Sequence, residues 1–229
     1  MKTIGLIGGM SWESTVPYYQ LINEYVKKEL GGLHSAKIAL YSVEFDEIEK
    51  CQSEDRWDDA AKILADAAAG LEKCGADFIL ICTNTMHKVY AQVQAAVSVP
   101  LIHIADATGE ALKAAGIQKV GLLGTRYTMQ QDFYKGRLAE AGFDVAVPPE
   151  EMIGELNRII FEELCVGEIR ESSRATFASA IEELKKEGCE GVILGCTEIG
   201  LLVRPEDSVL PVFDTTVIHA EAAAKKALE

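Results

Sequence analysis

Short apolar segments alternate with longer amphipathic segments along the whole chain. Residues 3–8, 37–43 and 77–82 are runs of the kind that buried strands of a parallel sheet show. Residues 54–73 open on acidic side chains and end just before Gly75, as helices commonly do. The pattern predicts an α/β fold with parallel sheets. Further strands are expected at 119–124, 143–147 and 191–194, and a long helical region at 150–187.

The two halves of the chain repeat one pattern. One similarity joins residues 4–8, I-G-L-I-G, to residues 120–124, V-G-L-L-G. A second joins residues 71–85, which end in I-L-I-C-T-N-T, to residues 184–198, which end in I-L-G-C-T-E, and it needs no gap. This alignment places Thr83 opposite Cys196 and Cys82 opposite Gly195. Because adjacent strand residues point to opposite faces, Cys82 is expected to end its strand and to face away from the chemistry. Two related lobes would present the carboxyl ends of their strands to a common cleft.

Composition and charge exclude several classes of partner. The chain has 22 basic and 36 acidic residues, a formal charge of −14, which repels phosphate backbones and anionic lipid. No apolar run approaches the roughly 20 residues that a membrane span needs, and the first residues lead directly into a strand-like segment. We therefore expect a cytoplasmic protein with no nucleic-acid or membrane partner.

The motifs give no sign of a cofactor or a metal. The six cysteines form no C-x-x-C pair and no Cys/His ligand spacing, so free thiols are expected rather than zinc or disulfides. G-L-I-G-G-M at 5–10 departs from the G-x-G-x-x-G fingerprint of dinucleotide-binding proteins. We expect neither a metal nor a cofactor.

A two-lobed cleft with one reactive residue on each side suits the inversion of a carbon stereocentre. One group must remove the proton from one face while a second group supplies a proton to the other. Backbone N–H groups in T-N-T and C-T-E could stabilise the carboxylate of the intermediate, and they could also lower the pKa of Cys196 towards the thiolate.

With G-L-I-G-G-M at 5–10, T-N-T-M-H at 83–87 and G-C-T-E-I at 195–199, the sequence resembles the cofactor-independent aspartate/glutamate racemases over essentially its whole length. The resemblance implies two Rossmann-like subdomains with parallel sheets, related by a pseudo-two-fold axis, and a homodimer. It divides the chain into an N-terminal lobe of 1–99 and 209–229, which regains the last strand and helix, and a C-terminal lobe of 100–208. The active site would lie in the cleft.

The first block departs from the family pattern C-N-T-x-H, because Thr83 stands where the family has a catalytic cysteine. The sequence is most similar to the L-aspartate/L-glutamate-specific subgroup with a Thr/Cys pair. The catalytic residues implied are Thr83 and Cys196. A threonine hydroxyl is a far weaker acid than a thiol, whose free pKa is about 8.5, so Cys196 is expected to be the dominant base.

The resemblance also implies a binding site for a small amino-acid substrate. Gln52 is the neutral candidate for the distal carboxylate, with Lys50 or Arg56 as alternatives, and Arg170 matches a second family position. His87 is expected to stand behind the reacting residues, and Glu198 to do the same or to cap a helix. His34, His103 and His219 are expected to be structural. The residues expected to line the α-amino and α-carboxyl groups are Met10, Asn84, Thr85, Thr125 and Thr197.

Two other functional classes stay open. Hydantoin racemases, maleate isomerases and arylmalonate decarboxylases are similar in architecture and differ in their reactive residues, so the fold alone does not assign the reaction. A small-molecule sensor derived from a racemase is the alternative that is not an enzyme, since the first thiol is missing.

Overall fold

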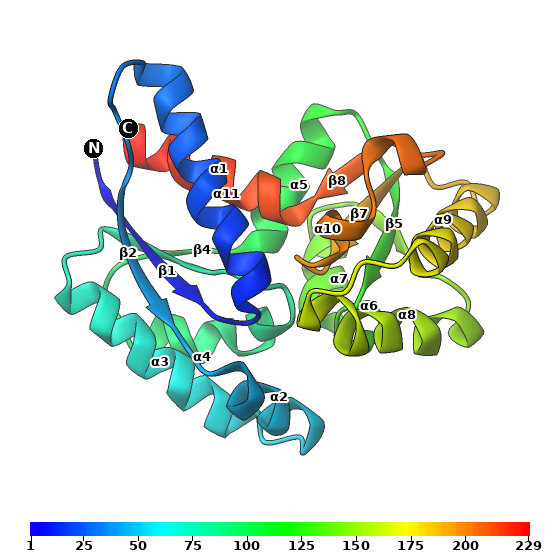
Figure 1. Cartoon of the computed structure of the whole chain (residues 1–229), viewed down its shortest axis with the longest axis horizontal. Helices are drawn as coiled ribbons and strands as arrows, with labels where there is room; N and C mark the ends of the chain where they lie inside the picture. Colours follow the sequence, from blue (N-terminus) through cyan, green and yellow to red (C-terminus); the bar gives the residue numbers. More distant parts are fainter. The chain divides into compact units, whose positions relative to one another are not determined.

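The computed structural model describes residues 1–229 and contains two four-stranded parallel sheets (Figure 1). The order in the first sheet is β2-β1-β3-β4, and the second repeats it as β6-β5-β7-β8. The predicted α/β class with two parallel sheets is confirmed. The strands are β1 Thr3–Gly8, β2 Lys37–Ser42, β3 Phe78–Ile81, β4 Leu101–Ile102, β5 Lys119–Gly124, β6 Asp144–Ala146, β7 Gly191–Gly195 and β8 Val212–Asp214.

Helices connect the strands throughout, as parallel pairing requires. None of them is both long and apolar enough to cross a membrane. The α-helices are α1 Trp12–Leu30, α2 Phe45–Ser53, α3 Trp57–Lys73, α4 Tyr90–Ala95, α5 Ile104–Ala114, α6 Arg126–Gln130, α7 Asp132–Glu140, α8 Glu150–Glu162, α9 Glu171–Lys186, α10 Ile199–Leu202 and α11 Thr215–Leu228; the 3₁₀ helices are η1 Thr85–Val89, η2 Leu164–Val166 and η3 Pro205–Asp207.

The chain forms two compact units. Unit 1 comprises Met1–Ile104 and His219–Glu229, and unit 2 comprises Ala105–Ile218. Strand β8 pairs in parallel with β7, so the last strand belongs to the second sheet. This differs from the expectation that residues 209–229 all return to the N-terminal lobe. Only the last helix, α11, returns: it follows a strand of the second sheet, but most of its residues belong to unit 1. In the same way α5 follows a strand of the first sheet, but nearly all of its residues belong to unit 2.

Alternating side chains of the buried strands divide the core of unit 1 into two layers. On β3, Phe78 and Leu80 pack with α1 and with the alanines of α11, whereas Ile79 and Ile81 pack with α3 and α4. Figure 1 shows α3 and α4 together beneath the sheet, with α1 on its other side. All four β3 side chains are buried, which explains why this strand is continuously apolar.

Strand register confirms the internal repeat. Ile4 pairs with Phe78 in the first sheet, and the residue equivalent to Ile4, Val120, pairs with Gly191 in the second. Phe78 and Gly191 are the residues that the gapless sequence alignment places opposite each other. The same alignment therefore holds at the strand ends, where Thr83 is equivalent to Cys196.

Equivalent tyrosines anchor the two exchanged helices. The hydroxyl of Tyr18 lies 3.0 Å from Nδ1 of His219 on α11. Its repeat equivalent, Tyr134, donates to Oγ1 of Thr108 on α5 at 3.2 Å. Both tyrosines are completely buried. Each unit thus uses the same aromatic position to bind a helix that enters it from the other half of the chain.

Two helical regions differ from the sequence-based expectation. Residues 45–53, for which no helix was predicted, form α2, because the carboxylate of the preceding Glu44 accepts from the backbone N–H groups of Asp46 and Glu47. The region 150–187 divides into α8, η2 and α9. Gly167 ends η2 in the left-handed conformation, with φ of 77°, where a continuous helix cannot pass.

Glycine 9 explains part of the G-L-I-G-G-M motif. Its φ is +88°, and a Cβ atom there would lie 2.3 Å from the carbonyl oxygen of Val43. Its backbone N–H donates to Oγ1 of Thr15 at 2.9 Å. The glycine is needed for a close approach of two backbone segments at the end of β1.

We predict that Gly9→Ala costs more than about 2 kcal/mol of unfolding free energy, because left-handed strain adds to a backbone clash. Gly116→Ala is the matched control, since φ is +73° there and nothing lies within 4 Å of the added Cβ. Urea unfolding of both variants measures the difference. Equal destabilisation would show that the approach to Val43 is not the constraint.

Candidate functional site

In unit 1 the candidate residues follow the carboxyl ends of β1 and β3. Ile7 pairs with Ile81, so the segments after these strands begin at the same edge of the sheet. Thr83 is 9% exposed and therefore almost enclosed. The structure gathers most of the candidates of the first half at this edge, all of them buried: Met10, Thr83, Asn84, Thr85 and His87.

Cys82 lies on the other face of the strand end from Ile81. Its side chain packs with Leu80 and Tyr18 in the layer that contains α1, and it is completely buried. Burial raises the pKa of the Cys82 thiol, so it stays protonated at neutral pH. These surroundings are those of an inert core thiol.

Of the three candidates for binding the distal carboxylate, Gln52 contacts the segment of residues 83–87. Its buried Nε2 lies 3.1 Å from Sδ of Met86. Lys50 is instead paired with Asp46 on the exposed side of α2, and Arg56 is paired with Glu54 and Asp59. Both alternatives are thus engaged at the surface.

In unit 2 the candidates follow the carboxyl ends of β5 and β7. Gly124 pairs with Gly195, so Thr125 and Cys196 emerge side by side at that edge. The hydroxyl of Thr125 accepts from the backbone N–H of Thr128 at 3.3 Å and caps α6. Cys196 is 7% exposed, and Thr197 beside it is also buried.

Glu198 contacts both residues that precede it. Its Oε2 accepts from Sγ of Cys196 at 3.0 Å and from Oγ1 of Thr197 at 2.9 Å. Burial raises the pKa of the Cys196 thiol well above its ordinary value, and the charge of Glu198 raises it further. The backbone N–H of Glu198 lowers the pKa of Cys196, as expected, but burial and the Glu198 carboxylate outweigh it, so the resting protein holds a thiol that donates to a carboxylate.

Arg170 precedes α9 and contacts none of the residues named above in the interactions that the structure shows. Its guanidinium contacts Glu168 and lies 3.5 Å from the buried carboxylate of Glu163. Glu163 also accepts from Ser173 and Arg158, and these bonds hold its pKa below the ordinary value. Arg170 thus belongs to an ion-pair network around Glu163.

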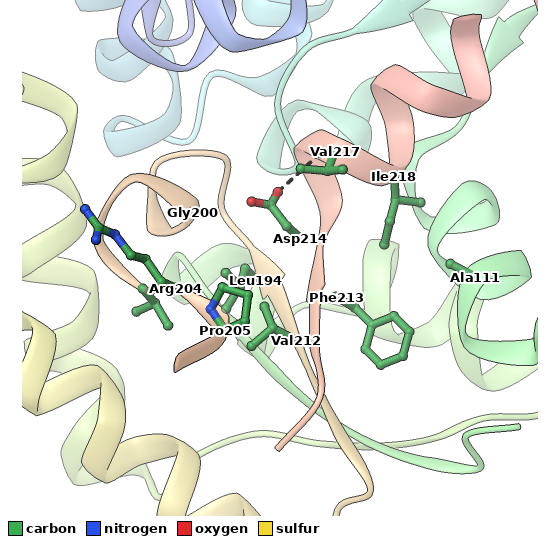
Figure 2. Close-up of a pocket in the computed structure, with 11 residues that line it drawn as sticks. Ala111, Leu194, Gly200, Arg204, Pro205, Val212, Phe213, Asp214, Val217 and Ile218 are labelled. Carbon is green, nitrogen blue, oxygen red and sulfur yellow. Dashed lines mark hydrogen bonds between the residues drawn. The ribbon is translucent and has the colours of Figure 1, made fainter. Parts of the chain in front are cut away.

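Unit 2 also contains a mostly apolar hollow of about 490 Å³ beside β8 and the start of α11 (Figure 2). Asp214 is its partly buried acid: Oδ1 accepts from the backbone N–H groups of Thr216 and Val217, and desolvation raises its pKa. None of the predicted site residues lines this hollow. Its walls are Ala111, Leu194, Gly200, Val203, Arg204, Pro205, Val212, Phe213, Asp214, Val217 and Ile218.

His103 and His219, expected to be structural, both lie against the ring of His87. The rings of His87 and His103 are 4.5 Å apart between centroids, and those of His87 and His219 are 5.9 Å apart. No sequence pattern identifies this cluster, because its three histidines come from segments far apart along the chain. No group of three or more His, Cys, Asp or Glu side chains is arranged to hold a metal ion.

A sequence profile described as Asp/Glu/Hydantoin racemase matches residues 7–223, nearly the whole chain. The chain belongs to this family. Its relatives include amino-acid racemases, which are isomerases, so the predicted family and enzyme class are confirmed.

Three relatives resemble the chain over essentially its full length. A broad-specificity amino-acid racemase of Bacillus subtilis (strain 168) is 25% identical over 232 residues, which cover 96% of this chain and 95% of the relative. The structure of a candidate Asp/Glu racemase from Yersinia pestis is 56% identical, with a TM-score of 0.92 and complete coverage of both chains. An aspartate racemase homologue from Pyrococcus horikoshii OT3 is 40% identical, with a TM-score of 0.86 and complete coverage of both.

We predict that Glu198→Gln lowers the pKa of Cys196. The carboxylate charge disfavours the thiolate, whereas the neutral amide can still donate to it, so the midpoint of thiol ionisation moves to lower pH. Ultraviolet thiolate absorbance against pH measures this, with Cys196→Ser subtracted in each background. An unchanged or higher midpoint would show that burial alone sets the pKa.

Proposed function

We propose that the protein racemises aspartate, glutamate or both, without pyridoxal phosphate or metal, with Cys196 and Thr83 exchanging the Cα proton at opposite faces. The observation that supports this assignment is the strand register, which makes Thr83 and Cys196 equivalent residues of two repeated sheets. A reaction that inverts a stereocentre needs two such groups. The 40% identical aspartate racemase homologue supports the substrate class.

The contact between Cys196 and Glu198 provides a route to the thiolate. The thiol proton passes to Oε2 of Glu198, and the thiolate then removes the Cα proton and becomes a thiol again. The displaced electron pair is held by the substrate's α-carboxylate. Glu198 is therefore proposed to activate Cys196, which the raised pKa of the thiol makes necessary.

Thr83 completes the inversion by protonating the opposite face. Its hydroxyl donates a proton to the carbanion-like intermediate, and transfer of the proton from Glu198 through solvent restores both residues. A hydroxyl is a much poorer base than a thiolate. We therefore propose that Cys196 acts on the L enantiomer and that the reverse direction, which starts at Thr83, has the smaller turnover.

Gln52 is proposed to bind the distal carboxylate of the substrate. A thioether is a weak acceptor, so exchanging Sδ of Met86 for a carboxylate oxygen strengthens the hydrogen bond of the Gln52 amide. The residues proposed to surround the α-amino and α-carboxyl groups are Met10, Asn84, Thr85, Thr125 and Thr197. A contribution of Arg170 to substrate binding and the formation of a homodimer stay predictions.

We predict that Cys196→Ser abolishes both racemisation and Cα deuterium exchange, with a loss of at least about a thousandfold, because the main base is removed. Proton NMR of aspartate and glutamate in deuterated water measures the exchange. The protein is first dialysed against a chelator and treated with hydroxylamine, which should leave wild-type activity intact.

Cys189→Ser is the matched control, since Cys189 is a buried free thiol of the same unit outside the site. It should retain exchange if it folds. Exchange that persists in Cys196→Ser would remove Cys196 from the mechanism. Wild-type protein that binds amino acids without exchanging them would support the sensor alternative instead.

A further inference from the structure

One residue, His87, closes the turn that carries Thr83. Its backbone N–H donates to the carbonyl of Asn84 at 3.0 Å, and its ring Nδ1 lies 2.8 Å from the carbonyl oxygen of Thr83. A carbonyl only accepts, so Nδ1 carries the proton. His87 thus satisfies two successive carbonyls of the turn.

The other ring nitrogen of His87 bonds to a different segment. Nε2 lies 3.1 Å from the backbone N–H of Ile104, which can only donate, so Nε2 accepts. The two bonds together define a neutral ring with its proton on Nδ1. Ile104 is the last residue of unit 1 before the chain enters unit 2, so the ring joins the Thr83 turn to this crossing.

The repeat shows that the fold does not require a histidine at this position. The residue equivalent to His87 in unit 2 is Gly200, and a Cβ there would lie 2.2 Å from Oδ2 of Asp214. In that unit the carbonyl of Cys196 accepts from the backbone N–H of Ile199 at 3.0 Å. The imidazole bond is therefore particular to the half that contains Thr83.

The ring of His219, which lies beside His87, is uncharged at neutral pH. Burial and, to a smaller extent, the neighbouring His87 lower the pKa of His219 to about 3. The groups packed around these two rings are His103, Tyr18 on α1 and Tyr90 on α4. The carbonyl of Ile102 lies 3.0 Å from Nε2 of His219, so that ring carries its proton on Nε2, the opposite tautomer to His87.

We propose that neutral His87 is a positioning residue for Thr83: its Nδ1–H bond sets the peptide that aims the Thr83 hydroxyl, whereas its Nε2 bond only stabilises the crossing at Ile104. This assignment rests on the proposed function, in which Thr83 transfers a proton. Proton transfer requires a fixed donor geometry, and misdirection of the hydroxyl lowers turnover more than substrate binding.

Two substitutions separate the two bonds. In His87→Asn the amide nitrogen occupies the place of Nδ1 and keeps the bond to the Thr83 carbonyl. In His87→Gln the amide oxygen occupies the place of Nε2 and keeps the bond to Ile104. His34→Asn is the control, because His34 is exposed and lies outside the cluster.

We predict that kcat for racemisation stays within about threefold of wild type in His87→Asn and falls about tenfold or more in His87→Gln, with KM nearly unchanged in both, because one hydrogen bond corresponds to a factor of about ten. Urea unfolding gives the stability of each variant. The assignment is overturned if kcat falls across the variants in proportion to their loss of unfolding free energy. It is also overturned if kcat is lower in His87→Asn than in His87→Gln.

Nitrogen-15 NMR of the wild-type imidazoles provides a test that needs no folded variant. The proposal expects His87 protonated on Nδ1 and His219 protonated on Nε2 at neutral pH. A His87 ring that is cationic, or protonated on Nε2, overturns it. Absence of Cα exchange by the wild type would instead refute the proposed function and leave these tautomers as they are.

Discussion

The parallel pairing of β1 with β3, repeated by β5 with β7, fixes the positions on which the proposed chemistry depends. These central strands are buried on both faces, so a slip of one residue would turn each side chain into the opposite layer of the core. Two equivalent leucines illustrate the constraint. A Cβ atom added to Gly5 would lie 3.3 Å from Cβ of Leu71, and one added to Gly121 would lie 3.2 Å from Cβ of Leu184. With the register held in this way, Thr83 and Cys196 follow their strands at equivalent places, and Cys82 is left in the core.

The sequence was sufficient for the central strands and their ends, because buried parallel strands are continuously apolar and their repeat can be aligned without gaps. It was insufficient for β4 and β8, which are only two and three residues long and pair at sheet edges. The pKa of Cys196 could not be predicted either. Its direction depends on the burial of the thiol and on the approach of the Glu198 carboxylate, and both are properties of the folded chain. The partners of His87 likewise come from segments far apart in the sequence.

The two repeats have diverged in chemistry while keeping the same backbone plan. Unit 2 places a thiol beside a carboxylate, which favours the thiol at rest and supplies an acceptor for its proton. Unit 1 places a hydroxyl on a turn that an uncharged imidazole closes. A thiol can act as acid or base near neutral pH, whereas a hydroxyl serves chiefly as a donor whose geometry must be held. The asymmetry between Cys196 and Thr83 thus extends to the residues that support them.

Racemisation by Thr83→Ala and Cys82→Ala, measured from each enantiomer of aspartate in deuterated water, tests the central claim most directly. If strand register assigns the second reactive residue, Thr83→Ala loses racemisation and Cys82→Ala keeps it, since Cys82 lies in the core layer with Leu80. A Cys82→Ala variant that folds but is inactive, together with a Thr83→Ala variant of normal activity, would contradict the account and make Cys82 the partner of Cys196.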